Sequence, residues 1–314
     1  MDGSMSNTYL SERRPRVLFF GMLGNFSYPS LQALIESGVD VCAVVLPMNA
    51  IPGNKESLIR QREQPAITAR ALPLLNSSLH ASIVHLAWSK QIPVWEVQTL
   101  SDTSVVSTLA TYEPDVICVA CFSLRIPRAI LDLPRLGCLN VHPSLLPDNR
   151  GPVPLFWAFR NDYDTTGVTI HYMEEIMDTG AILAQEPVAM PDGITYAQLE
   201  ALCATRGGSL LTETMWKLYH GQAVVTPQDE ARASYHSFPT AKDFVVPVRG
   251  WDARHVYNFI RGAGHWDEPI ELRVDEQSIF VRDVFSYSHG TTKSPHFPEQ
   301  IEIACQTGFI VLSL

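Results

Sequence analysis

The chain has 314 residues, 46% of them hydrophobic, which is enough to bury a large core and to form two domains. Its formal net charge of -10 at pH 7 argues against a large surface for binding phosphate groups, and residues 208–314 are acidic as well, with nine Lys or Arg against thirteen Asp or Glu. Residues 1–15 lack the apolar core of a secretion signal, and no apolar run approaches the roughly 18 residues of a membrane helix, so we expect a cytoplasmic protein.

Strand and helix patterns alternate through the first 120 residues. A continuous apolar run over residues 17–21 predicts a parallel strand that is buried on both faces. The glycines at positions 21 and 24 do not complete the three-glycine dinucleotide fingerprint, so a nicotinamide cofactor is not supported. Further strands are predicted at residues 39–46, 94–97 and 115–120, and helices at residues 28–37, 83–90 and 105–112. This alternation predicts an α/β fold with a doubly wound parallel sheet and right-handed crossovers.

The cysteines and histidines show no pattern of a disulfide framework or a metal site. Six cysteines lie in apolar stretches, which predicts reduced and buried thiols. Cys118 and Cys121 have the spacing of half a zinc or redox motif, but residues three apart on a strand face opposite sides. The ten histidines are scattered without the spacing of metal ligands, so we expect no metal.

The polar side chains that carry chemistry lie in the middle of the chain. Asn140 and His142 are two residues apart on a predicted strand, so their side chains face the same side. Two prolines after His142 end regular strand pairing, and a loop leads to a helix that begins near Pro154. Asp178 follows in a second loop, just before a turn glycine. An amide, an imidazole and a carboxylate together suit acyl transfer to an amine, because they can stabilise an oxyanion, carry a proton and favour the charged imidazole.

The remaining elements predict a second, smaller domain. Strands are predicted at residues 170–173 and 182–190, one or two helices at 195–219, and a linker at 222–242. A helix at residues 252–261 and short strand-like runs at 270–274, 278–285, 301–304 and 309–314 then predict a small β barrel. The predicted organisation is therefore an N-terminal extension (1–15), a catalytic domain (16–221), the linker (222–242) and a β-barrel-like domain (243–314).

Four motifs in order resemble one enzyme family. They are Asn140 to Pro147, Arg150-Gly151, Thr166 to Ile170 and Asp178 to Gly180, and the chain resembles the 10-formyltetrahydrofolate-dependent formyltransferases from Arg16 to its C-terminal end. It is most similar to the two-domain members, which act on methionyl-tRNA or on amino sugars of sugar nucleotides. The resemblance implies a Rossmann-like formyltransferase fold with an OB-like C-terminal barrel, and 10-formyltetrahydrofolate as the formyl donor.

The resemblance also implies roles for individual residues. His142 is the implied catalytic imidazole and Asn140 the oxyanion donor, while Asp178 sets the charge of the histidine and contacts the folate. The loop Phe122-Ser123-Leu124-Arg125-Ile126 is implied to wrap the pteridine ring, mainly through its backbone. An ordinary connection between a strand and a helix explains this loop almost as well.

Three further positions have structural and functional interpretations. Ser144 and Arg150 are candidate substrate-binding residues. Ser144 is better interpreted as a hydrogen-bonding loop residue than as a nucleophile, because no G-x-S-x-G motif surrounds it. Arg150 is expected either to steer a phosphate or the folate glutamate, or to hold the loop in place. Phe156 and Trp157 are expected to pack the following helix onto the sheet.

The identity of the acceptor amine stays open at this level. We expect a small molecule, with an amino sugar of a sugar nucleotide as the leading candidate. Formylation of methionyl-tRNA is the first alternative, and hydrolysis of formyl-folate is the second. Residues 48–82 carry four basic and two acidic side chains, and are interpreted either as a solvated loop over the acceptor cleft or as a contact with tRNA.

Overall fold

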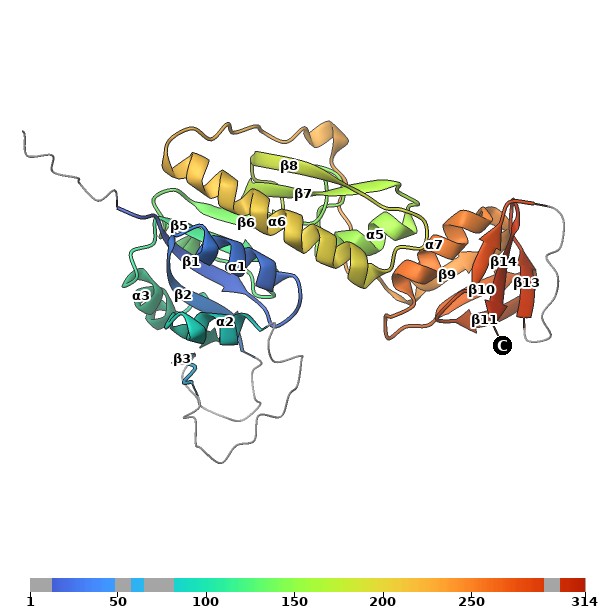
Figure 1. The fold of residues 1–314 in the computed structure, drawn as a ribbon, viewed down its shortest axis with the longest axis horizontal. Coiled ribbons are helices and arrows are strands. Elements are labelled where there is room, and N and C mark those ends of the chain that lie inside the picture. The colour runs from blue at the N-terminus through green and yellow to red at the C-terminus, as the bar shows by residue number, and fades with distance from the viewer. Residues whose placement is uncertain (1–12, 49–57, 65–81, 291–299, 314) are drawn as a thin grey trace, which may run out of the picture.

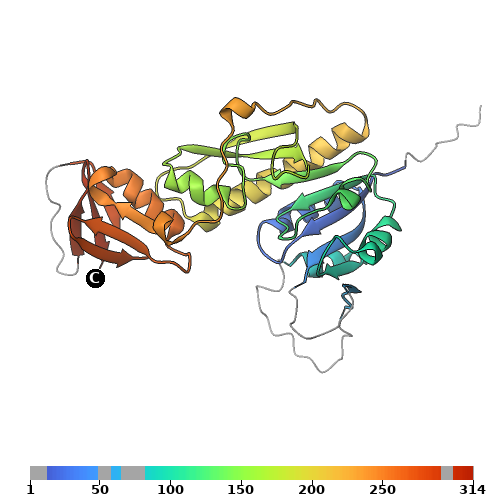
Figure 2. The ribbon, with the colours of Figure 1, turned by 180° about the vertical axis from the view of Figure 1, so that it is seen from behind.

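The structure is a computed structural model that describes residues 13–48, 58–64, 82–290 and 300–313. Its centre is an eight-stranded sheet (Figures 1 and 2). In spatial order, the strands are β3 (Ile59–Gln61), β4 (Val94–Val97), β2 (Asp40–Pro47), β1 (Arg16–Gly21), β5 (Val116–Ala120), β6 (Cys138–His142), β7 (Thr165–Tyr172) and β8 (Ile182–Ala189).

The middle of the sheet is parallel and its two edges are antiparallel. Strands β4, β2, β1, β5 and β6 run parallel to one another, as the sequence predicts. Strand β3 pairs antiparallel with β4, and β7 and β8 continue antiparallel from β6. The sequence analysis treats residues 48–82 as irregular, and β3 corrects this for residues 59–61. Lys55 and Arg70, two of the four basic residues in that segment, lie outside the described residues.

Helices cover both faces of the sheet, which confirms the doubly wound architecture. On β1, Val17 and Phe19 pack in a core with Leu31 of one helix, while Leu18 and Phe20 pack in a second core on the other face. A strand buried on both faces needs this continuous apolar sequence. The first face carries α1 (Ser27–Glu36), α2 (Ile83–Ser89) and α6 (Tyr196–Tyr219), and the second carries α3 (Thr103–Ala110) and α4 (Arg128–Leu131).

Residues 195–219 form a single helix rather than two. The N-terminus of α6 is held by a capping box, in which the Thr195 hydroxyl accepts from the Gln198 amide N–H and the Gln198 side chain accepts from the Thr195 N–H. Its apolar residues repeat at helical spacing, and Leu199, Cys203, Leu211 and Met215 are buried. In Figure 1, α6 crosses the sheet and ends near the start of β1.

The C-terminal β domain predicted from the sequence is present as two three-stranded sheets beside one helix. The sheets have the strand orders β11-β10-β9 and β12-β14-β13. Their elements are β9 (Val245–Pro247), α7 (Ala253–Ala263), β10 (Ile270–Val274), β11 (Gln277–Val281), β12 (Ser286–Ser288), β13 (Gln300–Ala304) and β14 (Phe309–Ser313). Short 3-10 turns lie at Glu230–Arg232, Ala241–Phe244 and Val248–Gly250.

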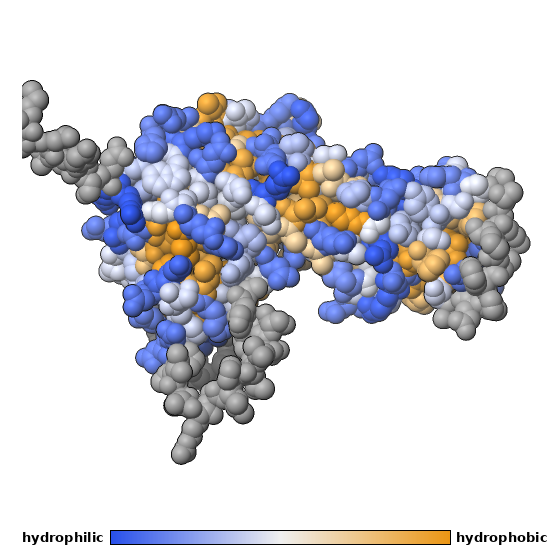
Figure 3. All heavy atoms as spheres, viewed as in Figure 1, coloured by the Kyte–Doolittle hydropathy of each residue, from blue (hydrophilic) through white to orange (hydrophobic). Residues whose placement is uncertain are grey.

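The helix after the central motif joins the two domains. In α5 (Pro154–Arg160), the ring of Phe156 contacts three aromatic rings of the C-terminal part, namely Phe244, Phe259 and Trp266, at centroid distances of 5.1 to 5.8 Å. Phe156 also belongs to the core that covers the first face of the sheet and Trp157 packs against that core, as expected, while Trp157 in addition stacks on His236 of the linker at 4.5 Å. On the face shown in Figure 3, hydrophobic surface gathers beside the start of α6, where the two domains meet.

No helix in the described parts of the chain is both long and apolar enough to span a bilayer.

Candidate active site

The site lies at the carboxyl edge of the parallel strands, where β5 and β6 end. Asn140 and His142 are both on β6, and His142 is only 4% exposed. Asp178 lies in the loop between β7 and β8, and its carboxylate Oδ2 is 3.7 Å from Nδ1 of His142. The structure therefore brings the three predicted catalytic side chains together at one edge of the sheet.

Both ring nitrogens of His142 face acceptor groups. The Nε2–H donates to the carbonyl oxygen of Asn149 at 2.9 Å, since a carbonyl oxygen can only accept. The Nδ1 atom faces the carboxylate of Asp178. The His142 ring is therefore held between a backbone carbonyl on one side and a carboxylate on the other.

His171 is a fourth polar side chain in the site, and the sequence analysis did not include it. Strand β7 pairs antiparallel with β6 and places His171 directly opposite Asn140. Its Nδ1–H donates to the Tyr172 carbonyl at 2.8 Å, which leaves Nε2 to accept from the Asn140 amide at 3.2 Å. The same Nε2 lies 3.7 Å from Asp178 Oδ1.

Burial keeps the His171 ring neutral. The side chain is 1% exposed, and the loss of hydration lowers its pKa to about 4, although the carboxylate of Asp178 acts in the opposite direction. A neutral His171 holds one N–H of the Asn140 amide and leaves the other available to a ligand. The sequence gives only a weak signal for His171, which directly follows the third motif. Its place in the site depends on the pairing of β7 with β6, which the sequence does not show.

The Asp178 loop is held by a backbone N–H of the loop that follows β6 and contains Gly151. The N–H of Gly151 donates to Asp178 Oδ2 at 2.8 Å. Asp178 itself has a left-handed backbone with φ of 57°, which Asp tolerates better than most residues. Glycine is required at two motif positions, since a Cβ on Gly180 would lie 1.8 Å from the Tyr172 carbonyl oxygen and one on Gly151 would lie 1.9 Å from that of His236.

Ser144 and Arg150 have partners within the protein. The Ser144 hydroxyl is buried and donates to the Asp148 carbonyl at 2.7 Å. The Arg150 guanidinium, 7% exposed, forms an ion pair with Glu230 at 2.7 Å and donates to Gln228. These contacts hold the loop in place, which is one of the two interpretations given for Arg150. A direct contact of either residue with a substrate stays a prediction.

The loop predicted to bind the pteridine ring begins at the same edge, directly after β5. The Phe122 ring packs on Phe20 of β1 at a centroid distance of 5.0 Å, and Ile126 is buried. Ser123 and Arg125 are exposed. Cys121, which begins the loop, is exposed as well, so the expectation of six buried thiols holds for five of them. Among the described residues, no group of three His, Cys, Asp or Glu side chains is arranged to hold a metal ion.

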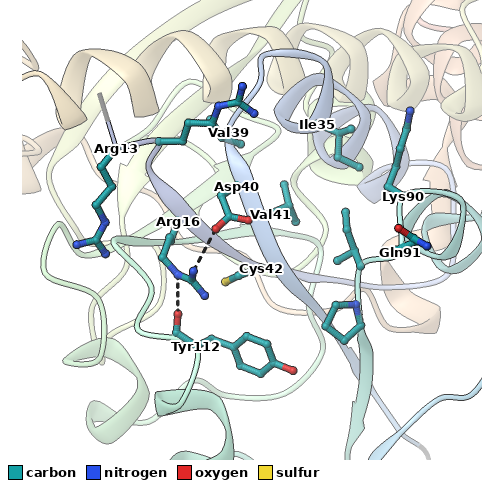
Figure 4. A pocket seen from close by; sticks show the side chains of 13 residues that line it. Arg13, Arg16, Ile35, Val39, Asp40, Val41, Cys42, Lys90, Gln91 and Tyr112 are labelled. Carbon is teal, nitrogen blue, oxygen red and sulfur yellow. Dashed lines mark hydrogen bonds and ion pairs between the residues drawn. The ribbon is translucent and has the colours of Figure 1, made fainter. Parts of the chain in front are cut away.

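A cavity of about 770 Å³ lies at the opposite, amino edge of the sheet (Figure 4). It is lined by Arg13, Arg14, Arg16 and Lys90, with Asp40 among them. Arg16 donates to the Tyr112 carbonyl at 2.9 Å and forms an ion pair with Asp40 at 3.2 Å. None of the four sequence motifs contributes a residue to this cavity.

Comparison with known proteins identifies the family of the chain. The chain matches the formyl transferase family over residues 16–215. It is 36% identical over 249 residues to a methionyl-tRNA formyltransferase of Synechococcus sp. (strain JA-3-3Ab), an alignment that covers 78% of this chain and 70% of that protein.

Two solved structures share the fold over nearly the whole chain. An N-formyltransferase from Helicobacter canadensis, in complex with folinic acid and dTDP-3-aminofucose, superposes with a TM-score of 0.61 and 15% identity, covering 94% of this chain and 98% of that one. WlaRD, a sugar 3N-formyl transferase, superposes with a TM-score of 0.63 and 15% identity, covering 96% and 97%.

The Asn, the His and the Asp converge at the carboxyl edge of the parallel sheet, which is where open α/β sheets bind their ligands. The matched residues include all four motifs. The chain belongs to the formyl transferase family, and it is a folate-dependent N-formyltransferase.

Proposed function

We propose that the enzyme transfers a formyl group from 10-formyltetrahydrofolate to the primary amine of a small molecule, with an amino sugar of a sugar nucleotide as the leading acceptor. The observation that carries the transfer reaction is the convergence of Asn140, His142 and Asp178, with His142 Nδ1 and Asp178 Oδ2 3.7 Å apart. The donor would lie at the carboxyl edge, with its pterin against residues 122–126.

The site supports direct attack of the amine on the formyl carbon. The new C–N bond turns the formyl oxygen into an oxyanion, which the remaining N–H of Asn140 stabilises together with His142. The Nε2–H of His142 donates to the Asn149 carbonyl, so donation from this atom to the oxyanion requires an exchange of that bond. The bond between the formyl carbon and the folate nitrogen then breaks, and the proton lost by the amine passes to that nitrogen. No covalent enzyme intermediate is needed.

The charges of the C-terminal domain support a small acceptor. Between residues 243 and 290, eight Asp or Glu residues outnumber five arginines, and each of the five arginines contacts a group of the protein itself. Four of them form ion pairs with Asp or Glu side chains, and the fifth donates to two backbone carbonyls; they are Arg249, Arg254, Arg261, Arg273 and Arg282. A tRNA-binding surface instead presents cationic side chains to phosphates.

Formylation of methionyl-tRNA is the second candidate, because the Synechococcus relative with 36% identity has that name. In the segment that we linked to tRNA binding, Arg60 and Arg62 both form ion pairs with Glu96 at 2.8 Å. These pairs are partly exposed, and such pairs contribute only about 0–1 kcal/mol, so they can be exchanged for phosphate contacts.

An acceptor screen tests the proposal. Purified enzyme is mixed with 10-formyltetrahydrofolate and, in separate reactions, with amino sugars of sugar nucleotides, with methionyl-tRNA or with no amine, and release of tetrahydrofolate is followed. We expect turnover that depends on the small amine. Turnover with methionyl-tRNA that decreases steeply with salt would instead support the second candidate. Formate release without any amine would indicate hydrolysis.

A further inference from the structure

The segment between the two domains lies along both loops of the active site. At its start, the backbone of Thr226 exchanges two hydrogen bonds of 2.8 Å with Ile182, just after the Asp178 loop. Further on, the N–H of Arg150 donates to the Ser234 carbonyl and the N–H of His236 donates to the Arg150 carbonyl, both at 2.9 Å. This segment, residues 226–236, is therefore a part of the catalytic domain rather than a free connection.

One side chain of this segment contacts both loops at once. The amide Nε2 of Gln228 donates to the carbonyl oxygens of Asp178 and Gly180, at 2.7 Å each. Its Oε1 accepts from Nη2 of Arg150 at 2.8 Å and from Nε at 3.1 Å. Two N–H donors and one carbonyl oxygen with two acceptor sites are the full hydrogen-bonding capacity of a Gln side chain. Gln228 therefore uses all of its polar capacity to connect the loops.

The two connected loops are the ones that hold His142 and Asp178. The loop at Arg150 contains the Asn149 carbonyl, which binds His142 Nε2, and the Gly151 N–H, which binds Asp178 Oδ2. The other loop carries Asp178 itself. The separation of the two loops thus determines how the carboxylate lies against the imidazole.

We propose that Gln228 is a positioning residue for formyl transfer, which sets the distance between Asp178 and His142 by connecting their loops. The effect on turnover rests on the proposed function, because formyl transfer is the reaction that is measured. The connection of the two loops by Gln228 does not rest on it. Gln228 acts through other residues and touches no reacting atom. An error of about 1 Å in the placement of a catalytic group can lower a rate by roughly 10²-fold, so a loosened connection is expected to reduce turnover.

The chemistry of the side chain allows a specific test. Gln228→Ala removes both the donor to the Asp178 loop and the acceptor for Arg150. Gln228→Glu keeps an acceptor for Arg150 but replaces the NH2 group, with its two N–H donors, by a carboxylate oxygen that repels the Asp178 and Gly180 carbonyls. Gln222→Ala is the matched control, because Gln222 lies in the same linker, is exposed, and makes no side-chain hydrogen bond among the described residues.

We expect kcat to fall roughly tenfold or more in both Gln228 variants, with the KM for the folate donor within about twofold of the parent value. Gln222→Ala should keep the parent kcat. Equal kcat values for the parent enzyme, Gln228→Ala and Gln228→Glu would overturn the proposal. A rise in donor KM with unchanged kcat would also overturn it, because it would show a loss of binding rather than of positioning.

A second measurement needs no substrate. The amide of Gly151 exchanges its hydrogen only when its bond to Asp178 opens, so its exchange rate reports on the two loops directly. We expect this rate to rise roughly tenfold or more in Gln228→Ala, while the amide of Val119 in β5 keeps its protection. If the exchange rate of the Gly151 amide is the same in Gln228→Ala as in the parent enzyme, the proposed connection is wrong, whichever acceptor the enzyme uses. If no acceptor supports turnover in the parent enzyme, the proposed function fails, and this experiment still decides on Gln228.

Discussion

The two edges of the large sheet differ in how their polar groups are arranged. The carboxyl edge brings Asn140, His142 and Asp178 together with His171, and all four come from two adjacent strands and one loop. The amino edge has a hollow of about 770 Å³ that is lined by cationic side chains, and none of the four motifs contributes a residue to it (Figure 4).

The predicted catalytic side chains lie where polar groups from separate segments converge, so a hollow lined by charged residues does not by itself indicate catalysis. At the amino edge, the buried carboxylate of Asp115 accepts from the Arg16 N–H at 2.8 Å and from the Arg135 guanidinium at 2.6 Å. Burial raises the pKa of this carboxyl group, but the two hydrogen bonds and the positive charges of Arg135 and Arg13 together outweigh burial and hold the pKa below its usual value. Such a group ties the ends of strands together, whereas the polar groups of the carboxyl edge, Asn140, His142 and Asp178, are those that the sequence motifs predict to be catalytic.

The largest expected effect is on catalysis at the carboxyl edge. Asn140→Ala and His142→Ala should each lower kcat/KM by about 10²–10³-fold, because each removes a donor to the oxyanion. Steady-state assays with the acceptor found in the screen measure the loss, and Lys90→Ala at the amino edge is the control. Near-normal turnover in both variants, with the fold intact, would show that the reaction takes place elsewhere.

The second effect concerns the pH dependence of stability. The pKa of His171 is about 4 in the folded protein against about 6.5 in an unfolded chain, so the unfolded state binds the proton more readily. Stability is therefore complete above pH 6.5, decreases as the pH falls from 6.5 to about 4, and changes little from this cause below pH 4. The total loss is about 3 kcal/mol.

Denaturant unfolding at pH 7, 5 and 4 measures this loss. The His171→Gln variant, which has no group that titrates in this range, should show a smaller loss between pH 6.5 and 4 than the parent enzyme. Parallel curves for the two proteins would contradict a neutral, buried His171.

The third effect separates stability from catalysis at the amino edge. Asp115→Ala removes the acceptor of the Arg16 N–H and leaves the Arg135 guanidinium without its partner, so we expect a loss of about 2 kcal/mol in the free energy of unfolding. At a temperature where the variant is folded, its kcat/KM should stay within about twofold of the parent value. A loss of activity beyond that in folded protein would mean that the two edges are coupled.

The smallest expected effect is at the cavity itself. Arg14 and Lys90 make no ion pair among the described residues, so replacing either by Ala should change the free energy of unfolding by no more than about 0.5 kcal/mol. Turnover should be unaffected. Loss of turnover in Arg14→Ala would contradict the contrast between the two edges and would give this cavity a part in the reaction.

Much of the fold follows from local patterns in the sequence. The apolar run at residues 17–21, the strand at 94–97 and the long helical repeat before Tyr219 each correspond to an observed element, because burial on two faces and helical spacing leave a direct mark on the residue order. The antiparallel edge formed by β7 and β8 left no such mark. Parallel and antiparallel neighbours can have the same apolar composition, and the direction depends on where the connecting helix α5 packs.

The candidate site divides in the same way. The sequence by itself determined the family and predicted Asn140, His142 and Asp178 as site residues, since each lies in a short motif with prolines or a turn glycine that the residue order shows directly. Only the tertiary structure decided that His171 faces Asn140 and that Gln228 connects the two loops, because these contacts join segments 31 and 50 residues apart. Periodicity describes which face of an element is buried, but the partner of a polar side chain depends on how distant segments pack together.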